Sequence, residues 1–416
     1  MDWGNAVNDA GAPERAARAV STQIPAAAPA YNRGGAWTGT WGTNPHALNS
    51  GDCDGGLVYS PAAPGLPVAA HSVLDVVPQL AGQSAAAALR ETAEVAQTAD
   101  DLGYRRFWLA EHHGVRGTGS ASPAVLAAIL AARTDRIRLG SGAVLLTNHQ
   151  PLVVAEQFAA LAAAYPSRID LGVAKAPSSP PSTAAALGWT DKAWDSFPQR
   201  LDELCRFLRD GLPGRAPVGD VRLALAGLPP PVFVLADSPA AAQVAAVRGL
   251  PVFLSHHTAS AATLAAAAAY RDSFEPTAPT GKPYVGVTVG VVAADSDEEA
   301  VSRLAEYVRV KGRLKTAPNR ATPAELMHLL EPPITNRERS RAERLLDDPG
   351  YVVGSRSGVA SGLATVAATT GADEIMLVPL AFDSLVRSAI LRTVAAGLTR
   401  AIRTIPRHAP HFVATA

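Results

Sequence analysis

Short apolar runs alternate with longer amphipathic segments along most of the chain. Residues 84–102 carry apolar side chains at helical spacing and end at Gly103, which is typical of a helix C-terminus. The β-rich run 107–109 follows directly, and after a loop Ser122 and Pro123 provide the N-cap and the first-turn proline of a second helix. The predicted order is therefore strand, helix, strand, helix, with short connections.

Two of these helices also show apolar positions on a single face. The positions are Val125, Ile129 and Ala132 in the helix after Ser122, and Val154, Phe158 and Leu161, predicted to face inward, in the helix that Pro151 begins and Pro166 ends. Each of the two segments is therefore predicted to be an amphipathic helix.

Eight apolar runs in this alternation predict buried strands. They are residues 72–77, 107–109, 137–145, 169–173, 231–235, 251–254, 284–292 and 374–378. Eight strands separated mostly by helices, between about residue 72 and residue 400, predict an α/β chain that forms a closed parallel (β/α)8 barrel, the TIM barrel.

A doubly wound nucleotide-binding sheet is the main alternative for such a pattern. Its fingerprint needs a glycine-rich turn after a strand and an acidic ribose ligand further on. Gly140-Ser141-Gly142 is the glycine-rich strand end, but Leu145 stands where the third glycine is expected, and no clear acidic residue follows at the usual distance. We therefore favour the barrel.

Polar side chains gather where two of the predicted strands end. Glu111, His112 and His113 follow the strand at 107–109, and His256 and His257 follow the strand at 251–254. The C-terminal ends of barrel strands carry the chemistry of this fold, so Glu111 and His112 are candidate catalytic residues. We assign His113, His256 and His257 to a substrate pocket, with one residue of the pair 256–257 lining it and the other packing behind; a structural role for both is the alternative.

The same imidazoles and carboxylate raise the question of a metal, because these ligands suit zinc or ferrous iron. Adjacent histidines on a strand point to opposite faces, and no His-Glu-x-x-His helix is present in the sequence. We therefore predict no metal site.

The composition of the chain limits the classes of molecule that it is expected to bind. The chain has 416 residues, of which 48% are hydrophobic, and 37 basic side chains balance 37 acidic ones. The balance and the lack of Lys/Arg blocks argue against nucleic acid or an anionic membrane as the main partner, and favour a small organic substrate. Cys53 and Cys205 are too few for a disulfide framework, and no signal peptide or membrane span is apparent, so we expect a cytoplasmic protein.

Three segments depart from the alternation. Residues 1–70 are rich in Ala, Pro, Gly and Asn but hold three of the six tryptophans, which suggests a packed arm; a disordered extension is the alternative. Residues 311–350, between a helix ending near Val310 and Tyr351, are a lid-like insertion in which 324–330 form a short amphipathic helix, or else a solvated surface excursion. Residues 401–416 are a C-terminal tail.

Several motifs within residues 72–400 occur in a fixed order. They are found at residues 72–75, 102–104, 108–113, 137–142, 151–158, 168–172 and 371–375. Together they resemble the luciferase-like flavin monooxygenase family. The resemblance implies a barrel that binds reduced FMN, at whose C4a carbon molecular oxygen forms a peroxyflavin that oxygenates a small organic substrate. It also implies a separate flavin reductase as electron donor and a homodimer formed through helices near the second and third strands.

Specific residues match the positions at which this family binds and uses its cofactor. His112 matches the active-site histidine, and Glu111 the acidic position beside the isoalloxazine. The peptide Gly142-Ala143 corresponds to a place where the family can carry a cis bond beneath the ring, although small residues in a crowded barrel layer are an equal explanation.

The phosphate site departs from the family in two places. Lys175 stands where an arginine is usual, so the charge is kept and the bidentate fork is lost. Asp237 and Ser238 begin the second phosphate element, where Ser238 is also a plain helix N-cap and Ala241 lacks the hydroxyl that some relatives carry.

Two other functions remain open on the same fold. One is an oxidoreductase that uses the deazaflavin coenzyme F420 and transfers hydride without oxygen chemistry. The other is a non-catalytic flavin-binding paralogue, which the departures at Lys175 and Ala241 make more credible. Loop residues set the specificity of barrel enzymes, so the substrate itself is not predicted.

Overall fold

The computed structural model describes residues 70–398, except 176–178, 190–194, 211–220, 224, 226, 278–280 and 319–320. The predictions for the N-terminal extension and for the C-terminal tail lie outside these residues. No helix in the described part is both long and apolar enough to cross a membrane.

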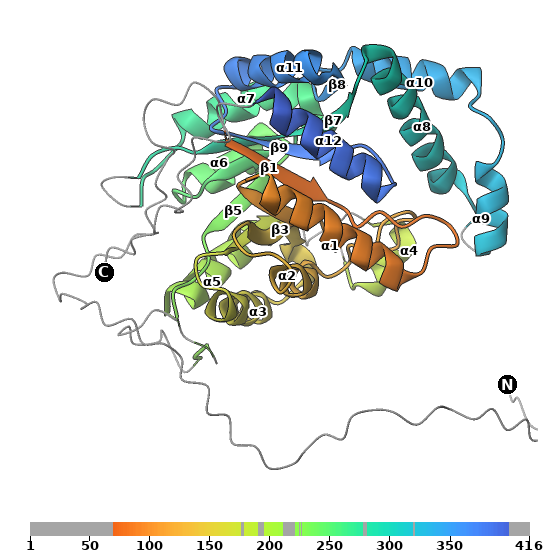
Figure 1. The fold of residues 1–416 in the computed structure, drawn as a ribbon. Helices are drawn as coiled ribbons and strands as arrows, with labels where there is room; N and C mark the ends of the chain where they lie inside the picture. The colour runs from red at the N-terminus through yellow and green to blue at the C-terminus, as the bar shows by residue number, and fades with distance from the viewer. Residues whose placement is uncertain are drawn as a thin grey trace, which may run out of the picture. The chain divides into compact units, whose positions relative to one another are not determined.

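Eight parallel strands close into a ring, with helices on the outside (Figure 1). The ring runs in the order β1, β2, β3, β4, β5, β6, β7, β9 and back to β1. The strands are β1 (Ala70–Asp75), β2 (Arg106–Leu109), β3 (Arg138–Leu145), β4 (Ile169–Ala174), β5 (Val232–Ala236), β6 (Val252–Leu254), β7 (Val285–Ala294) and β9 (Glu374–Pro379). The eight predicted strands and the (β/α)8 barrel are confirmed, with boundaries shifted by up to two residues.

A further strand, β8 (Tyr351–Ser355), was not expected from the sequence. The three residues of β6 pair only with the first part of β7, at Val285 to Val287. The second part of β7, from Gly290 to Ala294, pairs with β8 instead. The other edge of β7 pairs with β9. The strand β8 therefore lies on the same edge of β7 as β6, beyond the point where β6 ends.

Helices connect most of the strands. They are α1 (Ala85–Asp101), α2 (Pro123–Ala131), α3 (Pro151–Ala164), α4 (Pro181–Ala186), α5 (Phe197–Asp210), α6 (Pro239–Ala246), α7 (His256–Asp272), α8 (Asp297–Thr316), α9 (Pro323–Leu330), α10 (Asn336–Leu346), α11 (Arg356–Thr370) and α12 (Ser384–Gly397), with the 3-10 turn η1 (Leu146–Asn148) after β3. Ser84 caps α1 by accepting a hydrogen bond from the Ala87 amide. Ser122 occupies the N-cap of α2, but its side chain makes no capping bond, and Pro123 begins the helix.

The two apolar faces predicted for α2 and α3 have different surroundings. The predicted inward residues of α3, Val154, Phe158 and Leu161, are all buried. In α2 the buried residues are others, such as Leu126 and Leu130, whereas Val125 and Ile129 remain 57% and 37% exposed. The apolar face read from the sequence of α2 therefore points away from the barrel.

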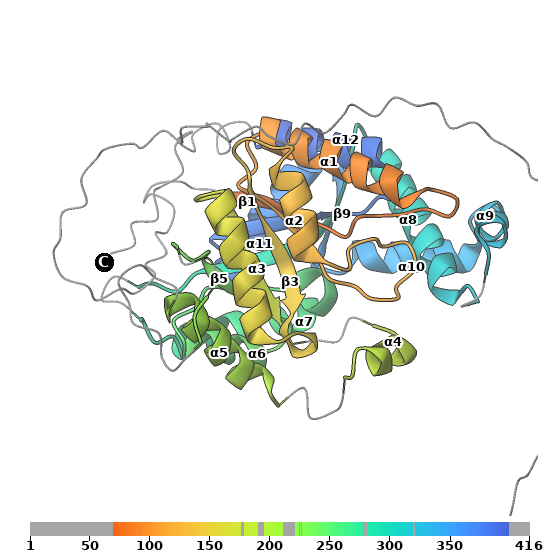
Figure 2. The ribbon, with the colours of Figure 1, turned by 90° about the horizontal axis from the view of Figure 1, so that it is seen from below.

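Residues 311–350 contain more helix than the sequence suggested. The helix α8 does not end near Val310 but continues to Thr316, and α9 confirms the short helix expected at 324–330. A second short helix, α10, packs along α8, where Arg313 contacts Glu338 at 2.7 Å (Figures 1 and 2). The sequence missed the continuation because the segment is mostly charged, and these charges pair with one another and with backbone carbonyls.

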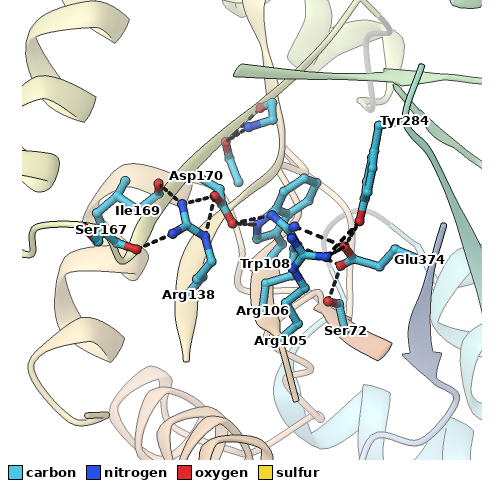
Figure 3. A network of polar contacts seen from close by, with 12 residues as sticks. Ser72, Arg105, Arg106, Trp108, Arg138, Ser167, Ile169, Asp170, Tyr284 and Glu374 are labelled. Carbon is cyan, nitrogen blue, oxygen red and sulfur yellow. Dashed lines mark hydrogen bonds and ion pairs between the residues drawn. The ribbon is translucent and has the colours of Figure 1, made fainter. Parts of the chain in front are cut away.

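The N-terminal half of the barrel interior holds a buried polar network (Figure 3). The Arg106 guanidinium lies 2.8 Å from Asp170 Oδ2 and 2.7 Å from Glu374 Oε1, and all three side chains are fully buried. Asp170 also accepts from Arg138 and from Trp108 Nε1, the latter at 3.0 Å. Because each charge has opposite partners, the network fills the barrel without leaving an unpaired ion among its three central members.

Aromatic rings separate this network from the other end of the barrel. Trp108 packs against Phe233 and Phe253 with ring centroids 5.0 and 4.8 Å away. Leu74 and Ala110 belong to the same buried cluster and lie toward the C-terminal ends of their strands. The barrel interior is thus layered. Ionic side chains fill its N-terminal half, aromatic rings fill the middle, and small apolar side chains lie at the C-terminal end, where the cavity begins.

Candidate active site

A cavity of about 250 Å³ lies at the C-terminal ends of the strands. Its floor is small and apolar, with Leu74, Val76 and Ala110 among the lining residues, and its rim is polar. The predicted site residues that line it are Glu111, His112, Gly142, Ala143, Lys175, Asp237 and His257. Residues that are more than a hundred positions apart in the sequence therefore meet around one space at the C-terminal ends of the strands.

His112 follows β2 and is held by its backbone. Its amide donates to the Ser120 carbonyl at 2.7 Å, which fixes the start of the loop. Burial lowers the pKa of His112, and the positive charge of Lys311 lowers it further, while Glu111 acts in the opposite direction. The imidazole is therefore neutral at neutral pH and able to accept a proton at the cavity wall.

Glu111 has both carboxylate oxygens engaged. Oε1 lies 2.7 Å from His113 Nε2 and 2.8 Å from His149 Nε2, and Oε2 accepts from the Leu145 amide at 3.1 Å. The carboxylate lines the cavity while its hydrogen bonds join the ends of β2 and β3. His113, predicted in the substrate pocket, contacts this carboxylate.

The pair His256 and His257 divides as the sequence suggested. His257 lines the cavity and its Nδ1 lies 2.7 Å from the Thr288 hydroxyl. His256 instead contacts Thr263 and the Pro349 carbonyl, each at 2.9 Å, so it packs behind. Both residues are the first in α7 rather than on a strand, which corrects the reason that we gave for their divergence.

The electrostatics around His257 resemble those around His112. Burial lowers the pKa of His257 to about 3, with further contributions from Lys311, His256 and His112. Both imidazoles at the cavity therefore remain uncharged at neutral pH.

One end of the cavity offers donors for an anion. Lys175 follows β4 and Ala241 lies in the first turn of α6, and both line the cavity. Ser238 is the N-cap of α6 and accepts from the Ala241 amide at 3.4 Å, so it positions the helix start rather than the wall itself. Asp237 lies at the same rim and is exposed, and its negative charge opposes that of Lys175.

The floor of the cavity includes the peptide Gly142-Ala143, which is cis. A Cβ at Gly142 would lie 2.7 Å from Leu74 Cδ1 and 3.2 Å from Trp108 Cβ, so a larger residue would displace the floor. The requirement for small residues and the cis geometry both occur at this position, and the two sequence-based explanations are compatible.

Several lining residues were not predicted from the sequence. Thr288, Ser255, Thr258 and Phe197 all contribute to the wall. Ser255 and Thr258 stand beside the histidine pair after β6, a position that could have indicated them, whereas Thr288 lies inside the apolar strand β7 and Phe197 in a helix far from the recognised motifs. His149, which contacts Glu111, follows β3 and would have been found by the same strand-end rule that selected His112.

Comparison with known proteins places the chain in a family. The family model described as luciferase-like monooxygenase matches residues 71–374. A luciferase-like monooxygenase of Escherichia coli (strain K12) is 37% identical over 322 residues, which cover 76% of this chain and 92% of that protein. The chain therefore belongs to the luciferase-like monooxygenase family, as the ordered motifs indicated.

Two further similarities bear on its activity and fold. The N-acetyl-S-alkylcysteine monooxygenase of Bacillus subtilis (strain 168) is 45% identical over 133 residues, or 32% of this chain and 40% of that protein. The crystal structure of apo-MsnO8 superposes with a TM-score of 0.67 and 31% identity, covering 80% of this chain and 98% of that one. The monooxygenases among these relatives support an oxidoreductase.

More distant solved structures share the fold and differ in cofactor. The oxygenating constituent of 3,6-diketocamphane monooxygenase from Pseudomonas putida, solved in complex with FMN, has a TM-score of 0.56 at 16% identity, with coverage of 79% of this chain and 97% of that one. An F420-dependent secondary alcohol dehydrogenase has a TM-score of 0.55 at 15% identity, with coverage of 80% and 99%. At these identities the likeness shows the fold alone.

Proposed function

We propose that this protein is a monooxygenase that uses reduced FMN and molecular oxygen to oxygenate a small organic substrate in the cavity above the aromatic layer. The observation that carries the proposal is the meeting, around one cavity, of a neutral, partly buried imidazole at His112 with Lys175 and the start of α6. Family membership gives the reaction class, and the cavity offers a distinct place for each part of the chemistry.

The residues of the cavity fit a flavin. The floor carries the small residues Gly142 and Ala143 beside the apolar side chains of Leu74 and Val76, a surface against which an aromatic ring system can pack. Lys175 and the positive N-terminal end of α6 would hold the phosphate, since a helix N-terminus and a cation both favour a dianion. Bound reduced FMN would supply the electrons that activate oxygen.

The chain itself then has three tasks. The apolar floor excludes water, which strengthens polar interactions inside the cavity. Glu111 fixes the ends of β2 and β3 through His113, His149 and the Leu145 amide. His112, neutral and partly buried, accepts or returns a proton at its ring nitrogen during oxygen transfer.

The proposal is tested by ligand binding and by isotope incorporation. Reduced FMN is titrated anaerobically, and the complex is then mixed with ¹⁸O₂ and N-acetyl-S-methylcysteine, a probe chosen because a relative is an N-acetyl-S-alkylcysteine monooxygenase. Binding of FMN together with ¹⁸O in the organic product supports the proposal. Tight binding of F420 without FMN binding would establish the deazaflavin alternative, and FMN binding with neither oxygen uptake nor product across a panel of organic substrates would favour the non-catalytic one.

Replacing Lys175 with Met should weaken FMN binding by about tenfold or more, because the phosphate loses a cation. Riboflavin lacks the phosphate, so its affinity should barely change. Fluorescence titration of both flavins against both proteins gives the ratio directly. Lys175→Arg is the matched variant and should retain or improve FMN affinity, since a guanidinium restores the fork. An equal loss for both flavins would show that Lys175 acts on the floor and not on the phosphate.

We also propose a cytoplasmic enzyme that receives its electrons from a separate flavin reductase and that forms a homodimer through α2 and α3. The support for the dimer is the apolar surface left on these helices, where Val125, Ile129 and Val153 are 57%, 37% and 46% exposed. Scattered apolar residues are common on surfaces, but these three lie on neighbouring helices.

Ile129→Glu should convert a dimer into a monomer, because a charge buried at an interface without a partner is costly. Light scattering coupled to gel filtration measures the mass. Leu385→Glu is the control, since Leu385 is 75% exposed on α12, outside the proposed surface. A wild-type monomer, or a dimer that both variants retain, would contradict this interface.

A further inference from the structure

Three potential metal ligands converge beside the cavity. The ligand atoms of Glu111, His113 and His149 all lie within 4.8 Å of one another. Both imidazoles direct Nε2 at the same carboxylate oxygen, at 2.7 and 2.8 Å. The residues come from the loops after β2 and β3, so the cluster joins two separate parts of the barrel rim.

The donor types select a class of cation. Two imidazoles with one carboxylate suit zinc and neighbouring first-row metals, whereas Mg²⁺ and Ca²⁺ prefer oxygen ligands alone. In a tetrahedral site with bonds of about 2.1 Å, ligand atoms lie roughly 3.4 Å apart. The contacts from Glu111 to the two imidazoles, at 2.7 and 2.8 Å, are hydrogen-bond distances, so a bound cation requires side-chain rotations that move the ligand atoms apart by about 0.6 Å.

The surroundings match those of a metal site in two respects. The second oxygen of Glu111 accepts from the Leu145 amide, the type of outer contact that orients a ligating carboxylate. The Glu111 side chain is fully buried, whereas those of His113 and His149 are 17% and 36% exposed. The carboxylate is therefore fixed inside the protein, whereas the two imidazoles lie next to solvent. A cation can enter from the solvent side, and a water molecule can be its fourth ligand.

We infer that Glu111, His113 and His149 form a binding site for a zinc-class divalent cation, which ties the loop after β2 to the loop after β3 at the rim of the cavity. The site reverses our sequence-based expectation of no metal, and it uses a histidine that the sequence reasoning did not consider. It does not depend on the flavin, so it stands or falls separately from the proposed function.

The test uses the full chain, treated with a chelator, dialysed, and free of added flavin. Titration with ZnCl₂ by calorimetry should show one tight equivalent, and added zinc should raise the melting temperature because it binds only the folded site. Titration with Co²⁺ should give the visible absorption of a site with nitrogen and oxygen ligands. His149→Ala should weaken zinc binding by about 100-fold or more, comparable to or beyond the loss of an outer-shell contact.

Two variants separate this site from other imidazoles in the chain. His328→Ala is the matched control, because His328 also lies 2.8 Å from a carboxylate, that of Glu331, but on an exposed helix with no third ligand nearby in the described residues. It should bind zinc like the wild type. His149→Cys replaces one zinc ligand by another and should restore binding if His149→Ala loses it through the ligand and not through misfolding. Absence of tight zinc binding, or tight binding that His149→Ala and His113→Ala leave intact, would overturn the inference.

Discussion

Replacing His112 with Ala is expected to slow oxygenation of the substrate by about 100-fold to 10,000-fold, the usual contribution of a positioned acid or base. His112 lines the cavity and is kept neutral by burial and by the charge of Lys311. FMN affinity should change little, because the proposed phosphate site at Lys175 and α6 is untouched. Single-turnover rates and flavin titration, measured on the same protein, separate the two effects.

The pH dependence of the reaction provides a second readout of the same residue. A base must be deprotonated to act, so the wild-type rate should fall at acidic pH as His112 becomes protonated. Because its pKa is lowered, this fall should lie below the ordinary histidine range of about 6.5. The acidic fall should disappear in the slow His112→Ala enzyme. The control variant is His328→Ala, at an exposed histidine, and it should keep the wild-type rate and its acidic fall. An unchanged rate for His112→Ala would show that His112 is not catalytic.

Glu374→Gln is expected to lower the free energy of unfolding by about 3–5 kcal/mol, the cost of breaking a buried ion pair by removing one charge. Glu374 is fully buried and accepts from Arg106 at 2.7 and 3.0 Å, and from Ser72 and Tyr284 (Figure 3). A neutral amide keeps the shape but leaves Arg106 with Asp170 as its remaining carboxylate partner in the barrel. The measurement is the shift in the urea midpoint followed by circular dichroism.

The surface pair Glu299 and Arg303 supplies the matched control. Their side chains lie 2.6 Å apart and are 43% and 30% exposed. Glu299→Gln makes the same chemical change in solvent and should cost less than about 1 kcal/mol. Equal urea midpoints for Glu374→Gln and Glu299→Gln would show that the barrel network does not stabilise the fold.

Acid should reveal the same network. Burial alone would raise the pKa values of Glu374 and Asp170, but Arg106 with Arg105 and Arg138 outweighs burial and lowers both. The stabilisation is therefore present above the unfolded carboxyl pKa of about 4 and is lost as pH falls through the lower folded values. Wild-type stability should drop in this acidic range, and Glu374→Gln should drop less steeply.

The barrel was predictable because its strands are continuous apolar runs and its caps have recognisable residues. The cavity residues that were predicted, such as His112 and His257, come directly after strands. Their positions in the sequence were therefore enough to place them at the C-terminal end of the barrel. Thr288 was missed because a single hydroxyl inside the apolar strand β7 carries no local signal. Lys311 was missed as a neighbour of both imidazoles because α8 was expected to end before it, and helix length depends there on ion pairs such as Arg313 with Glu338.

The direction in which the apolar face of α2 points could not be predicted from the sequence, for a different reason. Periodicity identifies an apolar stripe but does not say whether the barrel or another protein covers it, and Val125 and Ile129 face outward. The cluster of Glu111, His113 and His149 was missed because His149, which follows β3 after the turn η1, was not considered among the strand-end residues.

The strand β8 pairs with β7 but takes no part in closing the ring. Segments inserted or shortened between β7 and β8 therefore leave every hydrogen bond of the eight-stranded circle in place. This part of the molecule, which carries α8, α9 and α10, can therefore change in length without opening the ring. New substrate preferences can thus arise at that side without the loss of a closing strand.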